Sequence, residues 1–363
     1  MIGPPELIRP AKGLLEAALP PLGLLPAGSL NLNELLALKQ QQGVPVHVVF
    51  PVASPRESAN LEQLLAKLRP LRENLVDEVW LAYGGKRPGS LTRLKESFPE
   101  IRIFTARHDL PPDQKDAPLG KGAVMRAFLY HLVVAARQTQ PRTVVQFLDA
   151  DIRPPYFHPG WVVDPVGAIL SCRQVEAAKI VYHRPRGGRL NVMLRSLLAL
   201  CPHPGVQALQ KLVYLLSGEM AGTLHFWTNL PFKSGYGVEI RILLAFALNQ
   251  LQLAPPTPDL EHLVQVYVGH MDHRHAPLSS SPGKKGLDQM AGQVFHTLKE
   301  TLKEAGLLQC PGAAPGKPTL SIPVPAAVSS EVPTWLQVTL GDVTLPPLRS
   351  RPEVQRLLRE PGR

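Results

Sequence analysis

The most constraining feature of this sequence is a series of short apolar runs that alternate with segments of helical periodicity. Strands are predicted where β-branched and aromatic residues gather, at Val44–Phe50, Val76–Ala82, Ile101–Thr105 and Val144–Leu148. Leucines at helical spacing predict a helix over Asn60–Leu71, and a second, strongly apolar helix is predicted over Val124–Ala136. Strands that alternate with helices form βαβ units, so the sequence predicts an α/β fold with a mainly parallel, buried sheet flanked by helices.

Prolines divide the chain into three parts. The sequence holds 39 prolines in 363 residues, about twice the usual 5%. Six of them lie in the first 30 residues and ten in the last 53. We therefore predict a Pro-rich N-terminal segment (1–30), a single domain (31–305) that opens with a helix capped by Asn31 or Asn33, and a Pro-rich C-terminal extension (306–363) outside that domain.

Composition excludes several classes of protein. With 44% hydrophobic residues the chain can bury a large core, which excludes wholesale disorder. No apolar run reaches the roughly 18 residues that a membrane span needs. The three cysteines are far apart, which argues against a disulfide scaffold and a cysteine zinc site. These features predict a cytoplasmic protein that needs no membrane. The net charge of +10 suits either nucleic-acid binding or an enzyme for small phosphorylated ligands.

Two carboxylates follow the fourth predicted strand directly, in the tripeptide Asp149-Ala150-Asp151. Ligands of parallel sheets bind beyond the carboxyl ends of the strands, which is where these residues fall. A hard cation such as Mg²⁺ or Mn²⁺ relieves the repulsion between two carboxylates and can bridge to substrate phosphates. The structural alternative is a turn in which an aspartate caps a helix.

A second motif, Gly120-Lys121-Gly122, precedes the long apolar helix. Glycines allow the backbone to approach a ligand closely, and a lysine supplies a point charge for a phosphate. The spacing is not that of a P-loop. An exposed loop lysine is the structural alternative.

Basic residues and glycines come together in the stretch 179–195. It holds no acid and five cations: Lys179, Arg184, Arg186, Arg189 and Arg195. A cationic turn around Gly187 and Gly188 could clamp a phosphate or carboxylate, and Arg189 is the best placed of the five. We interpret the charge as a local site for a small anion, with a solvated loop as the alternative for Arg184 and Arg186.

Two further blocks contain residues capable of chemistry. Glycines surround acidic residues in 216–222 and 235–240, which predicts tight backbone beside a ligand; Glu239 precedes an apolar helix, where it could also serve only to stabilise the helix N-terminus. Residues 269–275 contain three histidines and Asp272. Alternate residues of an extended segment point to opposite faces, so we expect one histidine to complete the carboxylate metal site.

The order of these motifs resembles that of the retaining glucosyl-3-phosphoglycerate synthases of glycosyltransferase family 81. The resemblance covers roughly residues 30–278, and the block from Ser217 to Glu239 is its most specific part. A weaker similarity links the chain to mannosylglycerate synthases, which share a V-V-F-P opening, G-K-G and D-A-D.

The resemblance implies a GT-A fold and a metal-dependent hexosyltransferase that uses a nucleoside-diphosphate sugar. Asp151 and His273 would hold Mg²⁺ or Mn²⁺, Asp149 would bind the hydroxyls of the sugar nucleotide, and Lys121 its diphosphate or sugar. Pro51, Gly84 and Ala150 would complete the donor site, and Glu57 would replace an acid that the family carries two residues earlier.

For the acceptor, the resemblance implies 3-phosphoglycerate or a similar small acid. Its phosphate would be received by Gly188, Arg189 and Asn191, with His275 nearby. Glu239 would orient the reacting sugar or the acceptor hydroxyl, beside the backbone of Leu216–Gly218. Asn191 stands where the family has threonine, Met271 where it has arginine, and His275 where it has asparagine. Each change affects the acceptor side.

Four functional readings follow. The first is transfer of glucose from UDP- or GDP-glucose to the 2-hydroxyl of 3-phosphoglycerate, by front-face attack with retention, in a homodimer expected from the family. A related enzyme with another donor or acceptor, such as GDP-mannose and glycerate, is the second. A basic nucleic-acid-binding protein is disfavoured because only 6% of residues are aromatic. An inactive scaffold is disfavoured by the retained Asp149, Asp151, His273 and Glu239.

Overall fold

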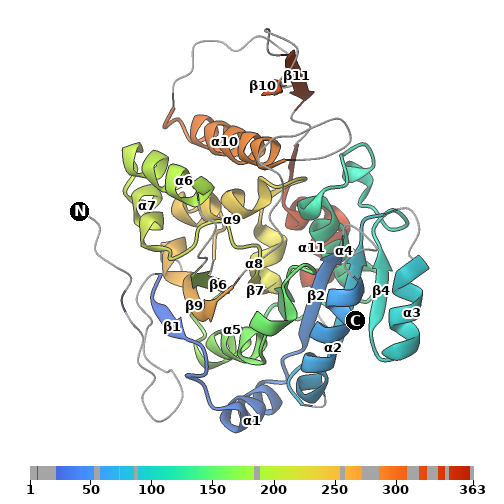
Figure 1. The fold of residues 1–363 in the computed structure, drawn as a ribbon. Coiled ribbons are helices and arrows are strands. Elements are labelled where there is room, and N and C mark those ends of the chain that lie inside the picture. The colour runs from blue at the N-terminus through green and yellow to red at the C-terminus, as the bar shows by residue number, and fades with distance from the viewer. Residues whose placement is uncertain are drawn as a thin grey trace.

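A computed structural model describes residues 6, 22–52, 58–72, 74–85, 89–183, 189–253, 258–271, 286–308, 319–324, 334–339 and 343–359. Its centre is an eight-stranded sheet with the order β1-β9-β6-β7-β5-β2-β3-β4 (Figure 1). The strands are β1 (Leu24–Pro26), β2 (Val46–Val52), β3 (Glu78–Tyr83), β4 (Arg102–Thr105), β5 (Val144–Phe147), β6 (Ala177–His183), β7 (Met220–Thr223) and β9 (Leu263–His270). Only β7 is antiparallel to its neighbours in this sheet, β5 and β6, so the predicted mainly parallel α/β sheet is confirmed.

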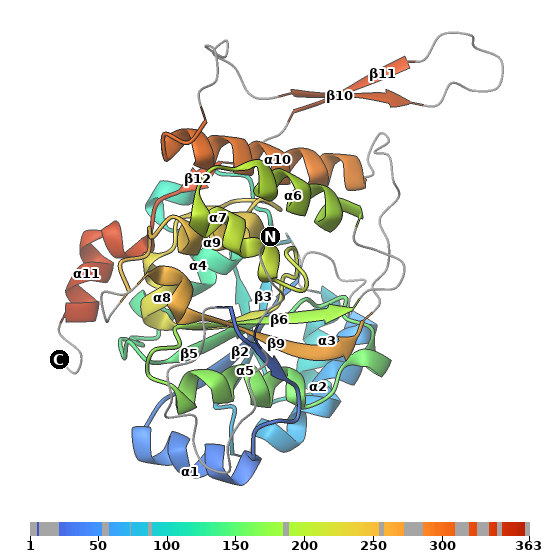
Figure 2. The same cartoon turned by 90° about the vertical axis from the view of Figure 1, so that its left-hand side faces the viewer.

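Helices cover both faces of the sheet (Figure 2). One face carries α1 (Leu32–Gln42), α2 (Ser58–Arg72), α3 (Gly89–Ser97) and α5 (Gly160–Ser171). The other side carries α4 (Lys121–Val134), α6 (Arg189–Leu200), α7 (Pro204–Ala208), α8 (Leu224–Asn229), α9 (Val238–Ala247) and α10 (Leu287–Glu304). Because both faces are covered, the central strands are buried and read in the sequence as continuous apolar runs.

The predicted elements agree with the structure to within a few residues. The four predicted strands correspond to β2, β3, β4 and β5, and the two predicted helices correspond to α2 and α4. Asn31 is the cap of α1, since its side-chain oxygen accepts hydrogen bonds from the amides of Asn33 and Glu34. The short strand β1 lies in the predicted Pro-rich N-terminal segment (1–30), yet it pairs in parallel with β9 of the domain. Three residues carry too little periodicity to predict a strand.

The strand order creates a switch point beside β2. From β2 the chain proceeds outward through β3 to β4, whereas β5 lies on the opposite side of β2. In open α/β sheets the crevice at such a point, beyond the carboxyl ends of the strands, is the usual ligand site. Pro51 is the penultimate residue of β2, Gly84 follows β3, and Asp149 to Asp151 follow β5. The sheet therefore gathers these predicted donor residues at one edge.

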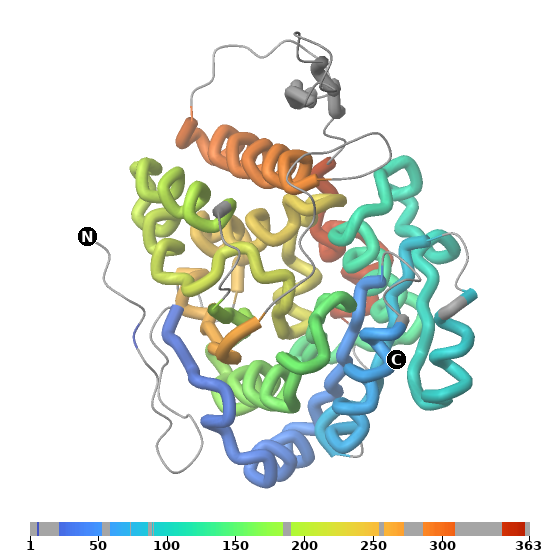
Figure 3. The backbone as a smooth tube through the Cα atoms, in the orientation of Figure 1, coloured from blue at the N-terminus to red at the C-terminus, as the bar shows by residue number. Residues whose placement is uncertain are grey.

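The last described part of the predicted C-terminal extension packs on the domain. Strand β12 (Thr344–Leu345) pairs with β8 (Phe232–Lys233), and helix α11 (Pro352–Arg359) lies against α4, as Figure 3 also shows. The carboxylate of Asp113 forms ion pairs with both Arg351 and the buried guanidinium of Arg126. Strands β10 (Thr319–Val324) and β11 (Thr334–Thr339) form a separate antiparallel pair. The boundaries predicted at residues 30 and 305 stay predictions.

The structure bears on the predictions about membrane spans and disulfides. No helix in the described part of the chain has the length and hydropathy of a membrane span. Cys172 and Cys201 are buried and not disulfide-bonded.

Candidate active site

Lys121 lies at the centre of the predicted site. It is the first residue of α4, and its amine lies 2.5 Å from a carboxylate oxygen of Asp149 and 3.0 Å from one of Glu239. Asp149 follows β5, and Glu239 lies in the first turn of α9. The structure thus brings together the three residues predicted as catalytic, from three separate elements; we call them the Lys121 cluster.

The cluster is largely shielded from solvent, and its charges are strongly coupled. The side chains of Lys121, Asp149 and Glu239 are 15%, 24% and 15% exposed. Burial disfavours the charged amine, but the attraction of Asp149 and Glu239 outweighs burial and raises the pKa of Lys121 well above its usual value. Lys121 therefore stays cationic, and the cluster carries a net charge of −1.

Gly218 borders all three members of the cluster. A Cβ atom at this position would overlap the amine of Lys121 and lie 2.8 Å from both Asp149 Oδ2 and Glu239 Oε1. Ordinary Cβ atoms do not approach oxygen so closely, so a larger residue would displace the charged groups. The prediction that dense glycines mark tight backbone at the site fits this position.

In the G-K-G motif, glycine is required at positions 120 and 122 for a different reason than the one we expected. We interpreted them as allowing the backbone to approach a ligand, but they pack against the protein's own backbone. A Cβ at Gly120 would lie 2.5 Å from the carbonyl oxygen of Ser234, and one at Gly122 would overlap the carbonyl of Lys233. This close packing holds the start of α4, and with it Lys121, against the loop that leads to Glu239.

The segment Leu212–Gly218 has no regular secondary structure, and polar side chains hold it in place. The guanidinium of Arg195 donates to the carbonyls of Gln210, Leu212 and Val213. Gln265 and Asn191 accept hydrogen bonds from the amides of Val213 and Leu215, each at 2.8 Å. Arg195 thus serves the fold, which corrects its inclusion in a five-cation anion site.

Asn191, a predicted acceptor ligand, is buried in the first turn of α6. Its side-chain oxygen is used by Leu215, as described above. Its role toward the acceptor stays a prediction.

A second layer of charge lies close to the cluster, and its members have other contacts than the sequence predicted. Lys179 on β6 is 2% exposed, Glu219 is fully buried, and the hydroxyl of Tyr182 lies 3.3 Å from Glu219 Oε2. The amine of Lys179 donates to the carbonyl of Ser217 at 2.7 Å. This contact corrects the assignment of Lys179 to the anion site. A lysine within the apolar run 177–182 was the available signal that a charge is buried there.

Tyr236, to which sequence reasoning gave no role, lies within the electrostatic influence of this acidic edge and is 39% exposed. Burial raises the pKa of its hydroxyl; Lys121 opposes this shift, while Glu239, Asp149 and Asp151 add to it. The backbone amide of Tyr236 donates to Gln293 of α10. Helix α10 therefore fixes the loop that precedes Glu239.

On the donor side, the described residues lie as the strand order requires. Gly84 donates its amide to the carbonyl of Val52, and a Cβ there would come within 2.7 Å of Val124 on α4. Pro51 pairs with Ala82 across β2 and β3. Ala150 is buried in the core, so only its backbone is available at the edge.

The carboxylates at this edge suit a divalent metal ion. Asp151 is half-buried at the carboxyl edge, next to Asp149, and carboxylate oxygens are the hard ligands that Mg²⁺ and Mn²⁺ prefer. Within the described part of the chain no group of three or more metal-ligating side chains occurs. The predicted partner ligand His273 lies outside the described residues.

Several other predicted site residues also lie outside the described residues: Glu57, Gly188 and His275, together with the side chain of Arg189. Met271, which stands in the place of a family arginine, is fully buried at the end of β9 and packs in the hydrophobic core.

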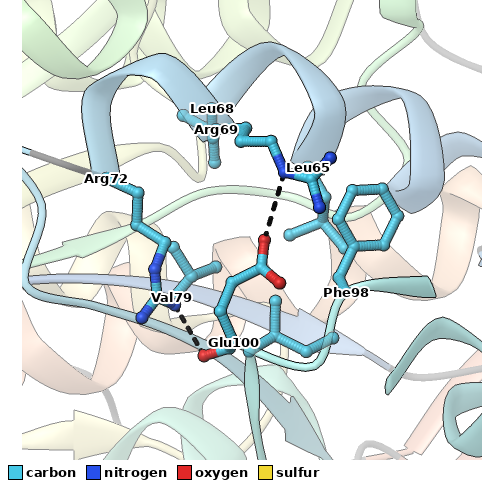
Figure 4. A pocket seen from close by; sticks show the side chains of 8 residues that line it. Leu65, Leu68, Arg69, Arg72, Val79, Phe98 and Glu100 are labelled. Carbon is cyan, nitrogen blue, oxygen red and sulfur yellow. Dashed lines mark hydrogen bonds and ion pairs between the residues drawn. The ribbon is translucent and has the colours of Figure 1, made fainter. Parts of the chain in front are cut away.

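A small cavity at the opposite edge of the sheet is not a second candidate site (Figure 4). It has a volume of about 10 Å³, room for about one water molecule, and lies beside the starts of β3 and β4. Two arginines that line it are already engaged: Arg69 pairs with the Glu100 carboxylate at 3.6 Å, and Arg72 donates to the Glu100 carbonyl at 2.6 Å. These contacts fasten α2 to the loop before β4.

Comparison with known proteins gives a consistent result. No protein-family model matches the sequence. A curated relative, glucosyl-3-phosphoglycerate synthase of Mycobacterium tuberculosis, is 30% identical over 285 residues, which are 74% of this chain and 76% of the relative. The glucosyl-3-phosphoglycerate synthase of Petrotoga mobilis is 28% identical over 289 residues, 77% of this chain and 79% of that protein.

Solved structures agree. The M. tuberculosis enzyme in complex with Mn²⁺, UDP and phosphoglyceric acid superposes with a TM-score of 0.67 at 27% identity, covering 96% of this chain and 99% of that one. The same enzyme has been solved with UDP-glucose and with glucosyl-3-phosphoglycerate. With the sequence and the fold both shared over most of their length, this chain belongs to the glucosyl-3-phosphoglycerate synthase family.

Proposed function

We propose that this protein transfers glucose from UDP-glucose to the 2-hydroxyl of 3-phosphoglycerate, with retention of configuration, and releases glucosyl-3-phosphoglycerate and UDP. The observation that carries the proposal is the Lys121 cluster at the carboxyl edge of the sheet, in a chain of this family. Crystal structures of the M. tuberculosis relative contain UDP-glucose together with phosphoglyceric acid, or the glucosylated product with UDP.

The donor is proposed to lie along the edge formed by β2, β3 and β5. Pro51 and Gly84 lie at the ends of β2 and β3, where the nucleoside would rest, and Glu57 would follow in the loop after β2. Asp151 and His273 would hold Mg²⁺ or Mn²⁺. A bound divalent cation would neutralise negative charge on the diphosphate as it leaves.

The charge of the Lys121 cluster suits the bond that breaks. Positive charge develops on the sugar ring when the bond to the diphosphate opens, and the net −1 of Lys121, Asp149 and Glu239 is complementary to it. Lys121 holds both carboxylates in fixed positions, so that Asp149 and Glu239 can accept hydrogen bonds from sugar or acceptor hydroxyls. The departing phosphate takes the proton of the attacking hydroxyl.

The acceptor is proposed to bind beside the start of α6 and the Leu212–Gly218 segment, which are linked by the hydrogen bond from the Leu215 amide to Asn191. Arg189 and Gly188 would receive its phosphate, and His275 is proposed to contribute to the same site. Since Met271 is apolar and buried, this chain has one acceptor-side cation fewer than the family pattern, and we expect a raised KM for 3-phosphoglycerate rather than a change of acceptor.

Exchange of donor, acceptor and metal tests the proposal. We expect UDP release to require UDP-glucose, 3-phosphoglycerate and Mg²⁺ or Mn²⁺ together, as measured by coupled assay across UDP- and GDP-sugars with 3-phosphoglycerate and glycerate. Asp151→Ala is expected to lower kcat/KM by about 100- to 1,000-fold, since the metal loses a carboxylate ligand. The control Asp109→Ala removes a half-exposed aspartate that pairs with His131 and is expected to stay near wild type. Turnover only with GDP-mannose and glycerate is the outcome that rejects this donor and acceptor.

We also propose an oligomeric state, a location and the absence of one class of partner. The protein is proposed to be a homodimer in the cytoplasm and to bind no nucleic acid. Light scattering after size-exclusion chromatography reports the dimer, and a salt-dependent gel shift reports any nucleic-acid binding.

A further inference from the structure

The Leu212–Gly218 segment ends in the glycine that touches the Lys121 cluster, yet it has no helix or strand to hold it. Its first half is fixed by Arg195 and Gln265, and its middle by Asn191. The carbonyl of Ser217, immediately before Gly218, is bound by Lys179. Gly218 is therefore flanked by two fixed points on β6: the Lys179 amine binds the carbonyl before it, and the Ile180 amide binds the carbonyl of Glu219 after it. Of these two contacts, only that of Lys179 depends on a side chain.

Lys179 lies where a charged amine loses its hydration. It lies in the middle of β6, opposite Met220 of β7 and Gln265 of β9, with 2% of its surface exposed. Burial lowers its pKa to about 8, although Glu239 and Glu219 oppose this shift. Charged groups face it from every side of the site: Glu239 from α9, Glu219 before β7, Lys121 from α4 and Asp149 after β5. Replacement of buried charged groups by well-packed apolar residues is often neutral or stabilising, so a lysine at this position calls for a specific role.

We propose that Lys179 is a positioning residue of the transfer site: its amine holds the Ser217 carbonyl so that Gly218 keeps its place against Lys121, Asp149 and Glu239. Glu219 balances the charge of Lys179 within the sheet and is itself held near Tyr182. The kinetic part of this inference rests on the proposed function. The structural part does not, because the contact and the segment exist without substrate.

Hydrogen–deuterium exchange measured by mass spectrometry tests the structural part. In Lys179→Met we expect peptides covering 212–219 to exchange about tenfold faster than in wild type, with peptides from α4 and α9 unchanged. Lys233→Met is the matched control, since Lys233 is equally buried but pairs with Glu300 of α10. That variant is expected to leave the exchange of 212–219 at the wild-type rate.

The double variant Lys179→Met/Glu219→Gln separates positioning from charge balance, because it removes the charges of Lys179 and Glu219 together. It also gives the answer if the single variant does not fold. We expect its thermal midpoint to recover toward wild type while residues 212–219 still exchange fast. Wild-type exchange of this segment in the double variant would show that Lys179 only balances charge and would overturn the proposal.

Kinetics give a second readout. With UDP-glucose and 3-phosphoglycerate, we expect Lys179→Met to lower kcat about 10- to 100-fold, with less than a threefold change in KM for UDP-glucose, because the shift falls at the transfer centre. An equal change in kcat and KM would contradict positioning. If the wild type transfers no glucose, the proposed function fails, and the exchange rates still decide the role of Lys179.

Discussion

Replacing Lys121 by methionine is expected to lower kcat about a thousandfold, the largest effect of any single substitution in this protein. Methionine has a similar length but no charge, so Asp149 and Glu239 would face each other without the amine that now lies 2.5 Å and 3.0 Å from them. The two carboxylates would then repel each other, with no cation between them. The cluster would lose its shape and its fixed charge together.

Steady-state kinetics of purified Lys121→Met, with its thermal midpoint measured alongside, check this expectation. Lys39→Met is the matched control: it removes a lysine that pairs with Asp77 at 2.8 Å at the opposite edge of the sheet. That variant is expected to keep kcat within about twofold of wild type, since this ion pair lies away from the site. A Lys121→Met enzyme with near wild-type kcat would remove Lys121 from the mechanism.

Adding one methyl group to Gly218 is expected to lower kcat about a hundredfold. The Cβ of Gly218→Ala would overlap the Lys121 amine and press on Asp149 Oδ2 and Glu239 Oε1 at 2.8 Å. Displacement of reacting groups by about 1 Å is enough for a loss of this size. The effect should appear in kcat with folding intact, because the three atoms nearest to the added Cβ are all ends of side chains.

The control for this substitution is Gly89→Ala, since a Cβ at Gly89 meets nothing within 4 Å. We expect wild-type kcat for that variant and the same thermal midpoint within about 2 °C. Steady-state kinetics of both variants, measured in parallel, test whether the loss of kcat is specific to Gly218. Full activity of Gly218→Ala would mean that the Lys121 cluster adjusts freely and does not depend on the backbone that borders it.

The sheet and the position of the site could be predicted from the sequence because both depend on local patterns. Apolar runs such as Val144–Leu148 mark buried parallel strands, and polar residues directly after them mark the ligand edge. Asp149 was identified in this way, whereas Lys121 and Glu239 were identified from glycine-containing motifs before helices and from the family resemblance. The structure brings both carboxylates into contact with Lys121.

Contacts between distant segments could not be predicted in the same way. The glycines beside Lys121 were explained by a ligand, whereas Ser234 and Lys233, more than a hundred residues away, are what they pack against. Lys179 was counted among the five cations of an anion site because the sequence pattern of charge does not report burial. Strand β1 and helix α11 lie in Pro-rich ends, where three or eight residues join the domain only through tertiary packing.

The anomeric configuration of the product tests the central claim most directly. Wild-type protein incubated with UDP-glucose, 3-phosphoglycerate and Mg²⁺ should form glucosyl-3-phosphoglycerate, and proton NMR should show the α-linkage of the donor preserved. A β-linked product, or UDP release at the same rate without 3-phosphoglycerate, would contradict the proposed retaining transfer.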